Sequence, residues 1–293
     1  MKISNTTGVL QERFGARKAA RLLCEAGFEA IDLSLIEIDD FYSNSYSAIC
    51  TDLREIADSF GVSFNQAHAP FHREEQYYFE NLFPKLPRAF EICANLGIPH
   101  IVIHPLKDNK RLFVKSRDEY DEKNLEFYRS IAPLARDYGV KIAIENMFCR
   151  HPDDMSKIID GTFSLADHHV AFFDKLDDRQ NFTVLLDVGH VALTDRDPAD
   201  NIRIIGGERL GGLHIQDVDL HHDLHTVPGL GKIDFESVCH ALAEIDYKGD
   251  FTLESLKFLL GFSDELIPDA LAFSARIASH LRDKIEKYKA DLK

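Results

Sequence analysis

The sequence of 293 residues lacks several features that would point to particular classes of protein. No apolar stretch approaches the about 20 residues that a membrane-spanning helix requires. The five cysteines include no CxxC pair, so we expect reduced, mostly buried thiols rather than a disulfide framework. Glycine-rich phosphate loops of the GxGxxG or GxxxxGKS type are also absent. These absences argue against an integral membrane protein, a disulfide-rich secreted domain and an open sheet that binds nucleotides.

Positive charge is scarce as well. The chain has 34 Lys and Arg against 49 Asp and Glu, which gives a formal net charge of −15. Such a surface repels phosphate backbones and anionic lipid, so we expect neither nucleic acid nor a membrane as a partner. Residues 1–8 do not have the basic and then apolar pattern of a signal peptide. We therefore predict a cytoplasmic protein with a small-molecule partner, and leave a homo-oligomer open.

What the sequence does contain is a repeated unit. Short apolar segments recur, several of them after a glycine, and patterns with helical spacing fill the gaps. The eight predicted strands are 2–5, 30–35, 62–68, 100–104, 141–145, 183–187, 210–214 and 250–254. The predicted helices are 16–26, 45–60, 86–96, 119–138, 165–176, 198–205, 235–245 and 264–288, and Ser116 and Glu119 form a capping box before the fourth.

Strands that alternate with helices at this spacing imply parallel pairing. Eight such units favour a closed (β/α)8 barrel, an α/β fold, over an open sheet. We find no linker or low-complexity tract and assign residues 1–293 to a single domain. The alternative is two domains with a break within 147–182.

Acidic and histidine side chains stand at most of the predicted strand ends. In a parallel barrel these ends meet at one rim, where active sites form. Carboxylates and imidazoles suit Mn²⁺, Mg²⁺, Co²⁺ or Zn²⁺, and three carboxylates buried together need a cation to offset their repulsion. The strand-end residues are His68, His104, Glu145, Asp187, His214 and Glu254, with His190 and His225 following closely and Asp223 two positions before His225.

Most of these residues lie in four sequence motifs. The motifs are IAIEN (142–146), LLDVGH (185–190), GLHIQD (212–217) and the segment 225–238 leading to GDFTLES (249–255). With them, the chain resembles the xylose isomerase-like barrel superfamily from about residue 2 to residue 254. The superfamily includes sugar isomerases and epimerases, inosose dehydratase-like proteins and apurinic endonucleases. In its epimerase branch, the resemblance implies that Glu145, Asp187, His214 and Glu254 bind the metal.

The resemblance implies a metal-dependent sugar isomerase or epimerase, with Mn²⁺ as our first choice of metal. In this hypothesis Glu145 and Glu254 also act as catalytic bases, moving a proton through an enediolate that the metal stabilises. His190 matches a position that contacts substrate. His68, His104 and Lys257 are further candidates for binding substrate. Ketohexose epimerases often carry an Arg shortly after the residue matching His214, and this chain does not.

Two alternatives stay open. The endonuclease branch uses three metals, and its additional ligands would fall on His68, His104, His190, Asp223 and His225, which supports a multinuclear phosphoesterase. The net charge of −15 argues against a protein that binds the phosphates of duplex DNA. The second alternative is a sugar-binding barrel without turnover. We further expect 147–166 to be a loop over the site, 71–83 to be a pocket wall or a packed helix, and Asp217 either to orient a ligand or to cap a loop.

Overall fold

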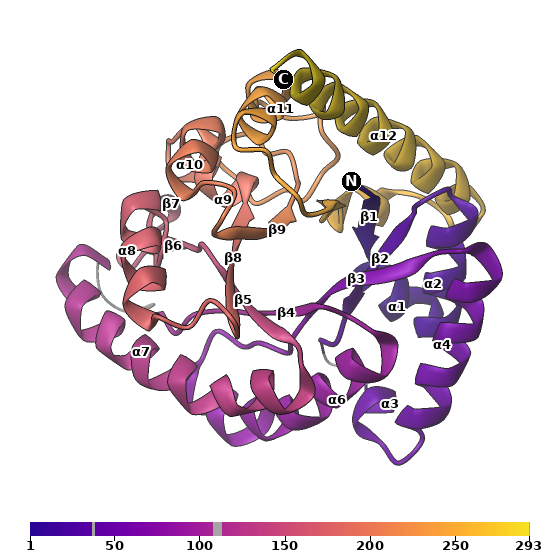
Figure 1. Ribbon diagram of the computed structural model, residues 1–293, viewed down its shortest axis with the longest axis horizontal. Coiled ribbons are helices and arrows are strands. Elements are labelled where there is room, and N and C mark those ends of the chain that lie inside the picture. Colours follow the sequence, from indigo (N-terminus) through magenta and orange to yellow (C-terminus); the bar gives the residue numbers. More distant parts are fainter. Residues whose placement is uncertain (37–38, 108–112, 293) are drawn as a thin grey trace.

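Eight parallel strands run through the centre of the molecule and form one continuous sheet, seen end-on in Figure 1. The computed structural model describes residues 1–36, 39–107 and 113–292. The eight strands are β1 (Ile3–Thr6), β2 (Ala30–Ser34), β3 (Ser63–His68), β4 (His100–Ile103), β5 (Lys141–Glu145), β8 (Phe182–Asp187), β9 (Leu210–His214) and β10 (Phe251–Leu253). Each overlaps one of the eight strands that the short apolar segments predict.

The sheet closes on itself, with the strand order β10-β1-β2-β3-β4-β5-β8-β9. Between β9 and β10 the closure depends on two backbone hydrogen bonds just beyond β9. Ile215 N donates to Thr252 O at 2.8 Å, and Glu254 N donates to Ile215 O at 2.9 Å. The predicted (β/α)8 barrel is therefore confirmed.

Helices surround the barrel (Figure 1), and their buried apolar side chains form one core with those of the strands. In α2 the side chains of Ala19, Leu22 and Leu23 are buried, as the helical spacing predicts. Gly97 adopts a left-handed backbone (φ 69°) after α6 and turns the chain into β4. The helices are α1 (Gly8–Phe14), α2 (Ala16–Glu25), α3 (Asp39–Tyr42), α4 (Tyr46–Phe60), α5 (Glu75–Tyr77), η1 (Tyr78–Leu82), η2 (Phe83–Lys85), α6 (Leu86–Leu96), α7 (Phe113–Tyr138), α8 (Ala166–Leu176), α9 (Val188–Leu193), α10 (Pro198–Ile205), α11 (Phe235–Glu244), η3 (Lys257–Gly261), η4 (Asp264–Leu266) and α12 (Ile267–Asp291).

The inside of the barrel is partly polar, whereas the layer between strands and helices is apolar. Ser4 Oγ donates to Thr252 Oγ1 at 2.8 Å, and Asn65 Nδ2 donates to both hydroxyls, at 3.0 and 2.9 Å. We call Ser4, Asn65 and Thr252 the barrel floor. These bonds offset much of the cost of burying the two hydroxyls and the Asn65 amide nitrogen.

Two local predictions are wrong. Residues 147–166 are not simply a loop, because β6 (Phe148–His151) and β7 (Asp154–Asp160) form an antiparallel hairpin there. The predicted start of a helix at 119 is also wrong, since α7 already begins at Phe113. No proline or glycine stands between Phe113 and Ser116 to stop the helix from extending that far.

The cysteines are as expected: all five are buried free thiols. Among the helices within residues 1–36, 39–107 and 113–292, none has the length and apolar character needed to cross a membrane.

Candidate metal centre

Four side chains converge at the rim formed by the carboxyl ends of the strands. Glu145 ends β5, Asp187 ends β8, His214 ends β9 and Glu254 directly follows β10. Each offers one donor atom, and these four atoms all lie within 4.8 Å of one another. His214 Nδ1 lies 2.9 Å from Glu145 Oε1 and 3.6 Å from Glu254 Oε2. All four side chains are buried, so their charges interact with little screening by water.

The charges of this group influence one another strongly. Burial alone would lower the pKa of His214, but the carboxylates of Glu254 and Glu145 outweigh it and raise that pKa to about 10. Burial would raise the pKa of Glu254, but His214 and His225 lower it to about 2. Burial raises the pKa of Asp187 to about 6. Three acidic groups thus share one buried space with a single protonated imidazole among them.

The donor set fits a divalent cation. Three carboxylate oxygens and one imidazole nitrogen make an oxygen-rich site of the kind that Mn²⁺, Mg²⁺, Co²⁺ and Zn²⁺ accept. A cation at the common point of these atoms would offset the repulsion between the carboxylates. The arrangement therefore suits the metal that the sequence motifs lead us to expect.

Two side chains that the sequence analysis missed position Asp187. Asn146 Oδ1 accepts from Asp187 N at 2.8 Å, and Asn146 Nδ2 donates to Asp187 O at 3.0 Å. Gln216 Nε2 donates to Asp187 Oδ2 at 2.9 Å and to Asp223 Oδ1 at 3.1 Å. Asn146 directly follows the predicted ligand Glu145 in IAIEN, and Gln216 stands two positions after the predicted ligand His214 in GLHIQD. Their closeness to the ligands in the sequence is the signal that could have identified them.

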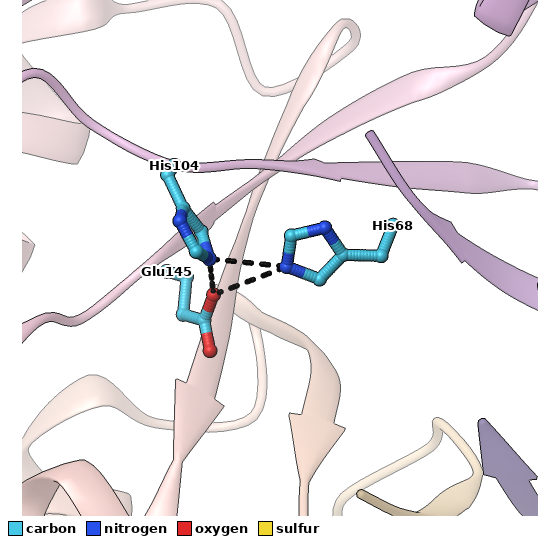
Figure 2. Close-up of side chains that lie close together, drawn as sticks. All are labelled: His68, His104 and Glu145. Carbon is cyan, nitrogen blue, oxygen red and sulfur yellow. Dashed lines mark hydrogen bonds and ion pairs between the residues drawn. The ribbon is translucent and has the colours of Figure 1, made fainter. Parts of the chain in front are cut away.

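A second group lies on the other side of Glu145 (Figure 2). His104 Nε2 is 2.8 Å from Glu145 Oε2 and 3.0 Å from His68 Nε2, while His68 Nε2 is 3.9 Å from Glu145 Oε2. His68 ends β3, and His104 directly follows β4. Burial, assisted by His104, lowers the pKa of His68 to about 4, so its ring is neutral at pH 7. His68, His104 and Glu145 also lie close enough to hold a cation.

The remaining candidates lie on the opposite side of the centre. His225 Nε2 is 2.9 Å from Asp223 Oδ2, and its Nδ1 is 3.2 Å from Glu254 Oε2. His190 Nε2 is 3.7 Å from Asp187 Oδ2 and 4.0 Å from Asp223 Oδ1. Lys257 is half exposed, and its ammonium group donates a hydrogen bond to the backbone oxygen of Asp223.

A cavity of about 330 Å³ opens above these groups, a size that suits a small molecule. Its floor includes Glu145, Glu254 and several of the histidines, and its walls are largely aromatic and aliphatic. The lining residues include His68, Phe71, Tyr78, His104, Lys107, Glu145, Met147, Phe148, His190, Asp223, His225, Glu254 and Leu256; Lys257 is not among them. The segment 71–83 therefore supplies part of the wall, and the hairpin contributes Phe148.

Asp217, for which two roles were open, caps a loop. Its Oδ2 accepts from Gly229 N and Gly231 N, each at 2.8 Å, and its Oδ1 accepts from Ile233 N at 3.1 Å. These bonds order the chain between His225 and α11, which belongs to the 225–238 segment singled out in the sequence.

Comparison with known proteins places the chain among barrels of this kind. A family model described as a xylose isomerase-like TIM barrel matches residues 20–277. An uncharacterised protein of Methanocaldococcus jannaschii is 27% identical over 214 residues, covering 69% of this chain and 68% of the relative. The inosose isomerase of Bacillus subtilis is 21% identical over 190 residues, 63% of each chain. An L-ribulose 3-epimerase of Methylomonas sp. is 30% identical over 142 residues, 48% of this chain and 42% of the relative. The matches thus span about two thirds of these relatives or less.

Solved structures agree over nearly the whole chain. A D-tagatose 3-epimerase-like protein has a TM-score of 0.75 at 21% identity, covering 98% of this chain and 99% of the other. The IolI protein with a bound zinc atom has a TM-score of 0.69 at 18% identity, with coverage of 98% and 99%. At these identities the likeness establishes the fold.

Proposed function

The chain belongs to the xylose isomerase-like TIM barrel family, and we propose that it is a divalent-metal-dependent isomerase or epimerase of a sugar or sugar-like hydroxy-carbonyl compound. The observation that carries this proposal is the convergence of Glu145, Asp187, His214 and Glu254 beneath a cavity of about 330 Å³. Inosose isomerase and L-ribulose 3-epimerase, both relatives of this chain, support the reaction class.

We assign the metal to those four side chains, and the zinc atom in the IolI structure supports such a site. A divalent cation held there supplies Lewis-acid stabilisation of the negative charge that develops on the substrate oxygens. The metal itself we expect to be Mn²⁺, with Zn²⁺, Mg²⁺ or Co²⁺ as alternatives.

Glu145 and Glu254 are the groups that we assign to proton transfer. Both are buried at the floor of the cavity and come from opposite arcs of the rim, after β5 and β10. Burial opposes ionisation of each carboxyl, but the neighbouring histidines outweigh it and hold both pKa values below their usual range. Each carboxylate can therefore accept a proton at neutral pH. One removes the proton next to the carbonyl, and the other returns it to the opposite face or to the adjacent carbon.

His68, His104 and His190 are suited to orient substrate hydroxyls. All three line the cavity, and a neutral imidazole such as that of His68 can both donate and accept a hydrogen bond. Two of these rings already have fixed orientations. His68 Nδ1 donates to Ala69 O at 2.8 Å, and His190 Nδ1 donates to Asn146 O at 2.8 Å. Nε2 of His190 is thereby left for a substrate, whereas Nε2 of His68 faces His104 Nε2 at 3.0 Å.

The test is exchange of the carbon-bound proton with solvent deuterium, measured with inosose and a panel of ketohexoses. Glu145→Gln and Glu254→Gln should each lower exchange by at least about 100-fold, because each removes a base while keeping the shape of the side chain. Glu236→Gln, an exposed carboxylate on α11, is the matched control and should exchange at the wild-type rate. Full exchange by Glu145→Gln would remove Glu145 from the mechanism.

A multinuclear phosphoesterase is the second candidate, and the group of His68, His104 and Glu145 is the observation that favours it (Figure 2). His68, His104 and Glu145 would hold a further cation there, and Asp223 with His225 would hold a third. Elemental analysis of the purified protein distinguishes the candidates: one metal per chain favours the isomerase, and three favour the phosphoesterase. Hydrolysis of a chromogenic phosphodiester, measured in parallel, decides the case of two metals.

A further inference from the structure

Asp32 is a carboxylate buried inside the barrel, in the middle of strand β2. Its side chain is fully shielded from solvent, and neither of its oxygens has a hydrogen-bond partner among the described residues. A buried charge without a partner destabilises a folded protein, so such a group calls for an explanation. In the barrel floor, by contrast, Asn65 Nδ2 and the hydroxyls of Ser4 and Thr252 bond one another, and the atom left without a partner, Asn65 Oδ1, is uncharged.

The nearest charged partner of Asp32 is the ring of His214. His214 Nε2 lies 3.8 Å from Asp32 Oδ2, just beyond hydrogen-bond range, and it too has no hydrogen-bond partner in the described part of the chain. The other ring nitrogen, Nδ1, points the opposite way and donates to Glu145 Oε1 at 2.9 Å. The imidazole therefore stands between the carboxylates of the rim and the single carboxylate beneath them.

This arrangement matters for how His214 can bind a cation. To ligate through Nδ1, the ring must give up the proton that it now donates to Glu145 and keep its N–H at Nε2. That nitrogen faces Asp32. A carboxylate that accepts the outer N–H of a ligating histidine fixes the tautomer, holds the ring in place and makes the ligating nitrogen more basic.

We propose that Asp32 is a positioning residue of the metal centre, whose carboxylate accepts the Nε2 proton of His214 and so favours the tautomer that binds a cation through Nδ1. The inference rests on the metal centre of the proposed function and adds to it a residue outside the ligand set. It also explains why a fully buried carboxylate makes no hydrogen bond to the residues around it: its partner in the metal-bound protein is the ring of His214.

The experiment compares Asp32→Asn with the wild type in two measurements. The first is affinity for Zn²⁺ or Mn²⁺, measured by competition with a chelating dye, and the variant should bind about 10 to 100 times more weakly. The second is thermal unfolding in the presence of a chelator, where the variant should be as stable as the wild type or more stable because it no longer buries an unpartnered charge. Asp32→Ser provides the same comparison if the amide variant does not fold.

The matched control is Asp121→Asn. Asp121 Oδ1 lies 2.8 Å from His168 Nε2, which is a similar pairing of aspartate and histidine away from the rim, so its loss should leave metal affinity unchanged. A wild type that binds metal, together with an Asp32→Asn variant that binds equally well, would overturn this inference alone. Asp32→Asn that lowers the unfolding temperature and keeps its affinity would assign Asp32 a purely structural role. A wild type that takes up no metal would overturn the metal centre itself.

Discussion

His214 is the residue through which proton and metal binding compete. Burial opposes its protonation, but Glu254 and Glu145 outweigh burial and raise its pKa to about 10, so without metal the ring carries a proton at neutral pH. A ligating nitrogen must be free of its proton. Metal binding should therefore release about one proton from His214, and apparent affinity should rise with pH until the pKa of about 10 is reached.

The measurement is titration calorimetry with Zn²⁺ at pH 7.5 in two buffers of different ionisation enthalpy. The observed heat should differ between the buffers by about the enthalpy of one proton. Heats that are identical in the two buffers would contradict the protonated state of His214. Release of two or more protons would favour additional ligands such as His225, whose pKa the carboxylates of Glu254 and Asp223 also raise against the opposing effect of burial.

Among the elements, the β6–β7 hairpin is the one best placed to influence the substrate. It follows Glu145 directly, and the Phe148 ring lies 5.1 Å from that of His190 in an edge-on contact. Asp160, the last residue of β7, pairs with Phe148 at the base of the hairpin, and Arg196 holds it through two bonds at 2.5 and 3.2 Å. Both strands of the hairpin are thus attached at its base.

Replacing Arg196 with Ala should loosen the hairpin without unfolding the barrel. Backbone amides of Phe148–His151 and Asp154–Asp160 should exchange with deuterium faster, while overall stability falls by no more than about 1 kcal/mol, because the ion pair is partly exposed. Hydrogen exchange read by mass spectrometry checks this. Arg179→Ala, which removes an exposed pair with Asp174, is the control, and equal exchange in both variants would contradict the anchoring role.

Elements that depend on the local sequence pattern could be predicted, whereas those that depend on contacts between residues distant in the sequence could not. Strands such as β5 and β9 were predictable, because a short apolar run with its polar residue at the end depends on local pattern and on the closure of the barrel. The hairpin was not, since DMSKIID in β7 has no continuous apolar run and is held by its partner strand. Likewise Glu145 could be singled out from its strand end, whereas the roles of Gln216 and Asp32 depend on contacts between strands.

For the molecule as a whole, the charge of Asp187 at the crowded rim places a cost on folding that a cation would relieve, because burial raises the pKa of this carboxyl to about 6. Glu145, Asp187 and Glu254 are all buried within one rim, and the chain already carries a net charge of −15. A ligand that binds only the folded state stabilises it by about 2.7 kcal/mol at a concentration 100 times its dissociation constant. Saturating Mn²⁺ or Zn²⁺ should therefore raise the unfolding temperature by several degrees.

Scanning calorimetry of protein stripped with a chelator and then reloaded measures this effect. Asp187→Asn should unfold at a higher temperature than the wild type without metal, and should gain less on reloading, because burial raises the pKa of Asp187 and its charge therefore opposes folding at neutral pH. The opposite order of the two proteins in the stripped state would contradict a repulsive rim.

Gly189, in the first turn of α9, lies against the side chain of Gln216. A methyl group on Gly189 would come within 2.6 Å of Gln216 Cδ and Cγ, so the two positions share a space that holds only one of them. Gln216 uses that space to hold Asp187, Asp223 and the backbone of His225 together. Divergence at these two sites should therefore be correlated in descendants of this chain: a lineage that acquires alanine at 189 should shorten residue 216 and, with it, lose the link between the two aspartates.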